Sequence, residues 1–215
     1  MKKKSLFFAL VLIMSFILWT ILVSFMNVRP IGPNNSLVGF SYINEFVRNI
    51  IGLNMKLYII TDWLGLVPIG FCFCFGVLGL VQWVKRRKFI KVDYSILILG
   101  AYYIIVILVY ILFEYLVINY RPVLINGYLE SSYPSSTTML VLCVMPTCIM
   151  QFNERIKIRK IKIIINILII SFTCFMVIGR LLSGVHWFSD IIGGVLLSGG
   201  LVLLYYYFLK LKCKD

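Results

Sequence analysis

The chain has 215 residues, of which 61% are hydrophobic and only 13% charged. A water-soluble globule needs more polar surface than this composition provides, so the composition excludes a soluble enzyme and predicts a chain embedded in lipid. The formal net charge of +13 would also suit a nucleic-acid binder, but such proteins gather their cations on one solvated face. Here the cations form short clusters between apolar runs, so no nucleic-acid partner is expected.

Six apolar runs follow one another along the chain. A spanning helix needs about 20 apolar residues, and backbone groups in lipid must be satisfied within helices or a closed barrel. The expected helices cover residues 6–26, 57–81, 94–118, 137–152, 161–182 and 188–209. We therefore predict an all-α, polytopic membrane bundle of about six transmembrane helices, with residues 1–215 forming a single membrane domain.

The first apolar run follows the segment Met1–Lys4. It is too long for a signal peptide and lacks a small-residue cleavage site before Asn27, so we interpret it as a retained anchor. Between the first and second runs, the stretch from Leu37 to Ile51 alternates apolar and polar residues. This stretch is expected to form a short amphipathic helix on the outer membrane surface.

The orientation of the bundle follows from the cations, because loops rich in Lys and Arg stay in the cytoplasm. Sixteen of the 21 cations lie in four clusters: three in Lys2–Lys4, five in Lys85–Lys91, five in Arg155–Lys162 and three in Lys210–Lys214. The clusters alternate as they should if both termini of a multi-pass protein are cytoplasmic in a bacterial-type plasma membrane. The other five cations then fall outside, and they are Arg29, Arg48, Lys56, Arg121 and Arg180.

Cysteines and glycines are interpreted as structural. The six cysteines lie in apolar segments or in the basic tail, where thiols behave as small hydrophobic groups; they are Cys72, Cys74, Cys143, Cys148, Cys174 and Cys213. No disulfide is expected, and Cys72 with Cys74 lacks the further ligands of a zinc site. Close packing between helices is expected at Gly76, Gly79, Gly193-Gly194 and Gly199-Gly200.

Three polar stretches fall near the expected outer ends of the helices, and they are Arg121-Pro122, Tyr133–Thr138 and Gly179–Asp190. His186 and Asp190 are four residues apart, so on a helix the carboxylate can accept a hydrogen bond from one imidazole nitrogen. That bond fixes the tautomer and leaves the other nitrogen as a nucleophile or base. Arg121 and Arg180 offer planar donors for phosphate oxygens, and the start of the fourth expected helix adds a positive dipole end.

Each stretch also has a plain structural interpretation. A single His beside an Asp is usually a hydrogen-bonded structural pair, and either arginine can anchor to lipid head groups. Pro-Ser-Ser-Thr is by itself a good helix N-cap. The occurrence of all three stretches on one side of the membrane favours a joint phosphate site.

Together the stretches resemble the three-part signature of the type 2 phosphatidic acid phosphatase superfamily, which reads K-x6-R-P, P-S-G-H and S-R-x5-H-x3-D. The superfamily includes polyprenyl-diphosphate phosphatases, inositol-phosphoceramide-type transferases and vanadium haloperoxidases. The match spans residues 114–190, and its third part is intact except for Gly179 in place of Ser. The resemblance implies His186 as nucleophile and Asp190 as its orienting carboxylate. It also implies phosphate ligands at Arg121, Arg180, Ser135 and Ser136.

Two chemically important family residues are replaced in this chain. The lysine of the first part falls on Glu114, and the histidine of the second part, the usual general acid, falls on Thr137. His186 is the only histidine in the chain, so no other His can supply the missing acid. Glu114 is expected to pair with Arg121 or Arg180, and the alternative is that it acts as a replacement general acid.

The expected function is that of a membrane phosphatase or phosphoryl transferase, acting on a lipid phosphate through a phosphohistidine at His186. A general acid contributes roughly 10²–10⁴ in rate, and its loss matters least when a diphosphate expels a phosphate, which favours polyprenyl or isoprenoid diphosphates. The alternatives are a catalytically impaired binder of phosphorylated lipid head groups and a small transporter. The expected partners are the lipid substrate and the bilayer, the resemblance implies no metal or other cofactor, and the oligomeric state is left open.

Overall fold

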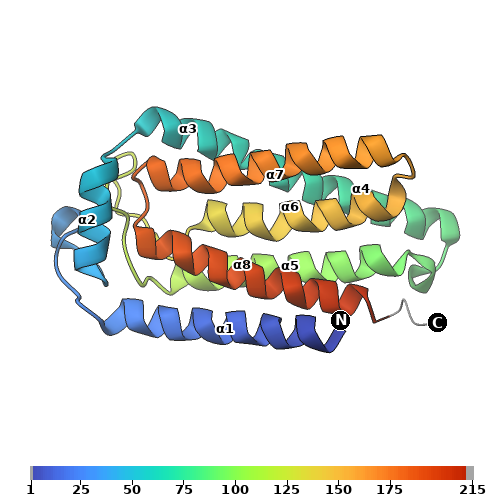
Figure 1. Ribbon diagram of the computed structural model, residues 1–215, viewed down its shortest axis with the longest axis horizontal. Coiled ribbons are helices and arrows are strands. Elements are labelled where there is room, and N and C mark those ends of the chain that lie inside the picture. Colours follow the sequence, from blue (N-terminus) through green and yellow to red (C-terminus); the bar gives the residue numbers. More distant parts are fainter. Residues whose placement is uncertain (1, 212–215) are drawn as a thin grey trace.

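The computed structural model describes residues 2–211, in which long helices run side by side and a short helix lies across one end (Figure 1). The helices are α1 (Lys2–Phe25), α2 (Ser41–Ile51), α3 (Met55–Leu64), α4 (Leu66–Arg86), α5 (Tyr94–Tyr115), α6 (Ser136–Arg155), α7 (Arg159–Leu182) and α8 (Phe188–Leu209), with 3-10 turns at Pro33–Asn35 and Phe89–Lys91. Extended pairing within residues 2–211 is limited to isolated β-bridges. Among the described residues, six helical segments are long and apolar enough to cross a membrane, so the all-α, multi-pass architecture is confirmed.

One expected helix is divided in two. The run predicted at 57–81 begins at Met55 and continues to Arg86, but Gly65 separates α3 from α4. Asn54 caps the first part, its side-chain oxygen accepting a hydrogen bond from the backbone N–H of Leu57 at 3.0 Å. Because α3 packs against α7, this division places the residues of α3 beside the end of α7.

Both ends of the described chain lie at the same end of the bundle (Figure 1). There α1 begins and α8 ends, and the turns that follow α4 and α6 carry the cations of Lys85–Lys91 and Arg155–Lys162. The opposite end, here called the site end, carries α2, the 116–135 loop and the 183–187 turn. Cys213 and the tail cations beyond Leu211 lie outside the described residues.

Glycines allow α8 to pack closely against its neighbours, as expected from the sequence. A Cβ on Gly200 would lie 2.7 Å from Cγ1 of Ile13 on α1, and one on Gly193 would lie 2.7 Å from the ring of Tyr133. Gly76 differs from the expectation, because a Cβ there would meet no atom within 4 Å. Gly76 faces a cavity rather than a neighbouring helix.

The amphipathic helix expected before the second span is α2, and its polar side faces the protein. The Asn44 side chain accepts a hydrogen bond from the Ser189 backbone N–H at 3.0 Å and donates to the Ser189 hydroxyl at 2.9 Å. Tyr42, Phe46 and Ile50 are exposed on the other side. The hydrogen bonds of the Asn44 side chain therefore join α2 to the start of α8, and the apolar side of α2 faces away from the bundle.

The turn before α8 packs closely against the loop between α2 and α3. Gly184 has a φ of +67°, and a Cβ added there would overlap the carbonyl oxygen of Gly52. Only glycine tolerates both that backbone conformation and that close approach. Arg48 donates a hydrogen bond to the carbonyl oxygen of Gly184, so the backbone leading into His186 is held from two directions.

Candidate active site

The loop between α5 and α6 folds into a hairpin that carries much of the site. Its two arms are paired by hydrogen bonds from Arg121 N to Glu130 O at 3.0 Å and from Ser132 N to Asn119 O at 2.9 Å. The turn lies at Asn126-Gly127, with φ values of 51° and 82°. An Asn-Gly pair is among the strongest hairpin signals in a sequence, so this hairpin could have been predicted.

His186 lies in the turn before α8 and is only 4% exposed. Its Nδ1 is 3.2 Å from the carbonyl oxygen of Ser132 and 3.1 Å from the hydroxyl of the same residue. Because a carbonyl can only accept, Nδ1 is assigned the hydrogen and Nε2 the lone pair. Nε2 is buried and has no hydrogen-bond partner within residues 2–211. It is therefore the nitrogen available as a nucleophile.

The structure corrects the expected contact between His186 and Asp190. We expected both on one helical face, but α8 begins at Phe188 and His186 precedes it. The Nδ1 to Oδ2 distance is 3.9 Å, too long for a hydrogen bond. Asp190 instead caps α8, its Oδ2 accepting from the Trp187 backbone N–H at 2.9 Å, and it also accepts a hydrogen bond from the Ser132 hydroxyl. Ser132, which the sequence did not single out, connects the two residues.

The Asp190 carboxylate is fully buried, yet both of its oxygens are satisfied. Besides the contacts to Oδ2, Oδ1 accepts hydrogen bonds from Asn119 Nδ2 and from the Ser189 hydroxyl, each at 3.3 Å. A buried carboxylate is tolerated only when it is hydrogen-bonded in this way. The network keeps a negative charge two hydrogen bonds from the imidazole, where it favours positive charge developing on the ring.

The protonation of His186 is set by its surroundings. Burial, and then the positive charges of Arg121 and Arg180, lower the pKa of His186 well below its usual value of 6.5. The imidazole is therefore neutral at neutral pH, which a nitrogen nucleophile requires. The positive charges of both guanidiniums therefore act on this ring.

The two arginines meet at the ring of Tyr58 on α3. The guanidinium carbon of Arg180 lies 5.0 Å from the ring centroid and that of Arg121 lies 6.0 Å from it. Arg180 Nη1 is 3.4 Å from Asp62 Oδ1, and Arg121 Nε is 3.2 Å from Glu130 Oε2. Carboxylate oxygens thus occupy positions beside the guanidiniums that phosphate oxygens would take. Tyr58, Asp62 and Glu130 were not predicted.

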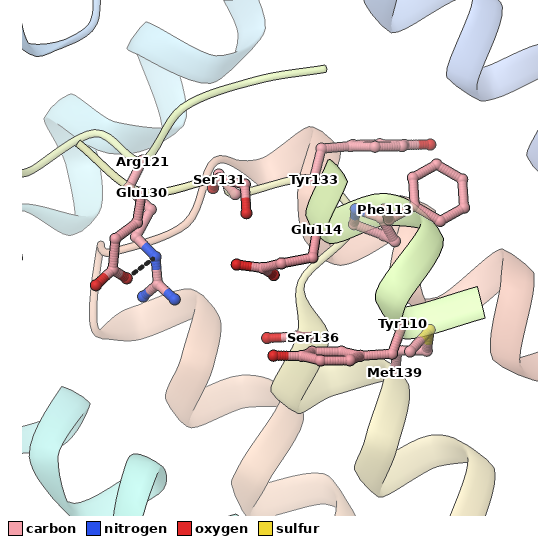
Figure 2. A pocket seen from close by; sticks show the side chains of 11 residues that line it. Tyr110, Phe113, Glu114, Arg121, Glu130, Ser131, Tyr133, Ser136 and Met139 are labelled. Atoms are coloured by element: carbon pink, nitrogen blue, oxygen red, sulfur yellow. Dashed lines mark ion pairs between the residues drawn. The ribbon is translucent and has the colours of Figure 1, made fainter. Parts of the chain in front are cut away.

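Glu114 does not form the expected ion pair with Arg121 or Arg180. Among the ion pairs of residues 2–211, Arg121 pairs with Glu130 and Arg180 with Asp62. The hairpin sets Glu130 directly across from Arg121, whereas Glu114 lies on the last turn of α5. Its carboxylate points into a cavity, between the Arg121–Glu130 pair and the hydroxyl of Ser136 (Figure 2).

This cavity has a volume of about 190 Å³ and holds the polar part of the site. Its lining consists of Tyr110, Phe113, Glu114, Arg121, Glu130, Ser131, Ser132, Tyr133, Pro134, Ser136 and Met139 (Figure 2). An unpaired, buried Arg121 Nη1 belongs to this lining, so the cavity suits an anionic ligand. Within residues 2–211 no group of three or more His, Cys, Asp or Glu side chains could hold a metal ion.

The residues of the expected second motif point in different directions. Ser136 lines the polar cavity, but Ser135 is fully buried and its hydroxyl donates to Thr138 Oγ1 at 3.0 Å. Ser136 is therefore the serine that reaches the cavity, and Ser135 contributes its backbone N–H to the carbonyl oxygen of Asp190. Thr137 lines a neighbouring cavity together with Asp62.

The fold and this site together define a membrane-embedded helical bundle with a buried histidine, its carboxylate relay and two arginines at one end. The family model of the PAP2 superfamily matches residues 94–213, and the chain belongs to that superfamily. Among solved structures, the chain is similar to a transmembrane PAP2-type phosphatidylglycerolphosphate phosphatase from Bacillus subtilis, with a TM-score of 0.63 and 17% identity over 96% of this chain and 98% of that chain. No match was found among curated proteins.

Replacing Ser132 by Ala is expected to impair turnover rather than binding. The hydroxyl contacts His186 directly and connects it to Asp190, and losing a hydrogen-bond partner that orients a functional histidine costs roughly 10- to 100-fold. We expect kcat for phosphate release to fall by about that factor while KM changes little. Ser131→Ala is the matched control, because Ser131 lines the same cavity without contacting His186. Equal losses in the two variants would contradict the assignment.

Replacing Glu130 by Gln is expected to strengthen binding of a phosphate-like anion, because it frees Arg121. Glu130 is partly exposed, so the gain should be modest, about two- to five-fold in the inhibition constant of orthovanadate. Glu114→Gln should have a smaller effect, since Glu114 is not the partner of Arg121. A larger effect of Glu114→Gln than of Glu130→Gln would indicate instead that Glu114 is the partner of Arg121, as first expected from the sequence.

Proposed function

We propose that this protein is a lipid phosphatase or phosphoryl transferase that forms a phosphohistidine at His186. The observation that carries the proposal is a buried, neutral imidazole whose Nδ1 is held by Ser132 while Nε2 remains free. The positive charges of Arg121 and Arg180 act on the same ring, and both guanidiniums lie against the ring of Tyr58. A phosphate held by Arg121 and Arg180 would place its phosphorus before Nε2, so that positioning and charge stabilisation supply most of the catalysis.

The reaction proceeds in two displacements. In the first, the lone pair of Nε2 attacks phosphorus, and the bond from phosphorus to the leaving oxygen breaks. The positive charge that develops on the ring is stabilised by Asp190 through Ser132, and the equatorial oxygens are stabilised by the two arginines. In the second, water or an acceptor alcohol attacks the phosphohistidine, loses its proton to solvent and returns the imidazole to its neutral form.

The leaving group favours diphosphate lipids. Thr137 stands where the family has a general acid, and a threonine hydroxyl cannot protonate an alkoxide as imidazolium does. A monoester must expel an alkoxide, whereas a diphosphate expels a phosphate that leaves without added protons. The preferred substrates are therefore diphosphates of polyprenyl or isoprenoid alcohols.

The site end is proposed to face the outside, with both termini in the cytoplasm of a plasma membrane. The cation clusters Lys85–Lys91 and Arg155–Lys162 lie at the end opposite the site, as the positive-inside rule requires. The exposed apolar side of α2, with Phe46 and Ile50, suits the interface beside the outer leaflet. The substrate would then be a lipid of that leaflet.

A second candidate is a catalytically impaired protein that binds phosphorylated lipid head groups. Glu114 and Thr137 favour it, because both replace residues that support turnover in the family, while Arg121 and Arg180 are kept. The following test separates the two candidates.

Phosphoryl trapping is expected to label His186. Brief incubation with a lipid diphosphate carrying radioactive phosphorus should give a labelled chain whose label is lost in acid and kept in alkali, as for a phosphorus–nitrogen bond. The chain contains no other histidine, so a label identified as phosphohistidine can only be on His186. His186→Ala should abolish both the label and phosphate release. Turnover that persists in His186→Ala would refute the mechanism, and saturable lipid binding without any turnover would support the binder.

Replacing Thr137 by His is expected to accelerate the hydrolysis of phosphate monoesters but not that of diphosphates. Thr137 lines the same cavity as Asp62, whose carboxylate reaches Arg180, so an imidazole there lies near the expected phosphate. Hydrolysis of phosphate monoesters should rise by about tenfold or more, and that of diphosphates should change little. The measurement is kcat for both classes with the wild type as reference. Equal enhancement of both classes would contradict the leaving-group argument.

A further inference from the structure

Three cavities lie in a row along α5, and together they are called the groove here. The polar cavity of the site is followed by one of about 480 Å³ and then by one of about 650 Å³. The first two share Tyr110, Ser136 and Met139 in their linings, and the second and third share Cys72 and Ile107. Residues of α5 line all three cavities, residues of α6 line the first two, and residues of α4 line the second and third.

The groove is nearly as long as a bilayer is thick. Along α5 its lining extends from Glu114 at the site end to Ile96 near the opposite end. These residues are about 18 positions apart, which corresponds to about 27 Å of helix. The hydrocarbon core of a bilayer measures about 30 Å, so its midplane lies about 15 Å from either surface. The groove therefore passes well beyond the midplane.

Only the site end of the groove is polar. Charged and hydroxyl side chains gather around Arg121, and the far cavity is lined by apolar groups such as Phe75, Leu80 and Trp83. Gly76 and Gly100 belong to the far cavity, and a Cβ at either would meet no atom within 4 Å. Both glycines are exposed, so they line an open cavity rather than bringing two helices together.

We propose that this groove holds the single hydrocarbon chain of the lipid whose phosphate binds at Arg121, and that it selects one long chain over the two shorter chains of a phospholipid. The proposal rests on the proposed function and adds where the hydrocarbon chain lies and how its length is selected. Acyl chains of an ordinary phospholipid reach only to the midplane, about 15 Å or ten residues of helix from Glu114, so they would fill the groove only about as far as Ile104. A polyprenyl chain is long enough to continue to Trp83.

The selectivity comes from shape rather than from the hydrophobic effect. A chain gains no transfer free energy on leaving lipid tails for an apolar groove, because both surroundings are equally apolar. A chain that fills the groove does gain close contacts along its whole length, and a short chain leaves part of the lining without partner atoms.

Filling the groove with a side chain tests the proposal. Gly100→Phe and Gly76→Phe place a ring in the far cavity. Gly70→Phe is the matched control, because a Cβ at Gly70 also meets nothing within 4 Å but Gly70 lines none of the three cavities. The substrates are a long polyprenyl diphosphate and a short isoprenoid diphosphate with the same head group.

We expect Gly100→Phe and Gly76→Phe to lower kcat/KM for the long substrate about tenfold or more, as overpacking of a filled site does. The short substrate and the Gly70→Phe control should be unaffected. Equal losses for both substrates, or the same loss in Gly70→Phe, would overturn the proposal. A change of oligomeric state in Gly100→Phe without a change in chain-length preference would assign the groove to a second copy of the chain instead.

A measurement without turnover separates this proposal from the proposed function. Cys72 lines the groove, whereas Cys74, on the same helix, is exposed and lies outside it. A long-chain polyprenyl phosphate should slow the modification of Cys72 by a membrane-permeant maleimide and leave Cys74 unchanged, as followed by peptide mass spectrometry. Protection of Cys72 without phosphate release would uphold the groove and refute the phosphatase. Phosphate release without protection would do the reverse.

Discussion

The site end of this protein depends on one constraint, which is that the buried carboxylate of Asp190 must have hydrogen-bond donors for both oxygens. Leaving such a charge uncompensated in a low-dielectric interior costs several kcal/mol. The donors come from the start of α8 at Trp187 and Ser189 and from the hairpin at Ser132 and Asn119. The carboxylate thus fixes where the hairpin meets α8, and this junction in turn places the imidazole.

The same network extends to the surface through α2. Asn44 contacts Ser189 through both its backbone and its hydroxyl, and Arg48 reaches the backbone of Gly184. Both of these α2 side chains lie opposite the apolar side of the helix. The orientation of α2 at the end of the bundle and the position of the His186 turn are therefore set by the same few hydrogen bonds.

Features that depend on local sequence were predicted well. Hydropathy placed the six spans, and the spacing of Arg180, His186 and Asp190 identified the family, because both signals lie within short stretches. Gly76 could not be assigned from hydropathy, since an apolar helix looks the same whether a glycine faces a neighbouring helix or an open groove.

The contacts across the site could not be predicted from the sequence, because they join segments whose relative placement depends on tertiary folding. Ser132 and Glu130 reach the site because they lie on the hairpin. Tyr58 and Asp62 reach it because the second apolar run is divided into two helices at Gly65. Among these features, the Asn126-Gly127 turn is the one that the sequence itself predicts. With it, the pairing of Arg121 with Glu130 rather than Glu114 becomes a natural expectation.

The carboxylates of Glu130 and Asp62 also bear on how a reaction cycle would end. Once the lipid monophosphate has left and the phosphohistidine has been hydrolysed, the free phosphate at the arginines has no hydrocarbon chain to retain it. The two carboxylates are tethered beside the guanidiniums, and their effective concentration exceeds that of any dissolved anion. In an enzyme of the proposed kind they would replace the departing phosphate, so that turnover continues in surroundings rich in inorganic phosphate.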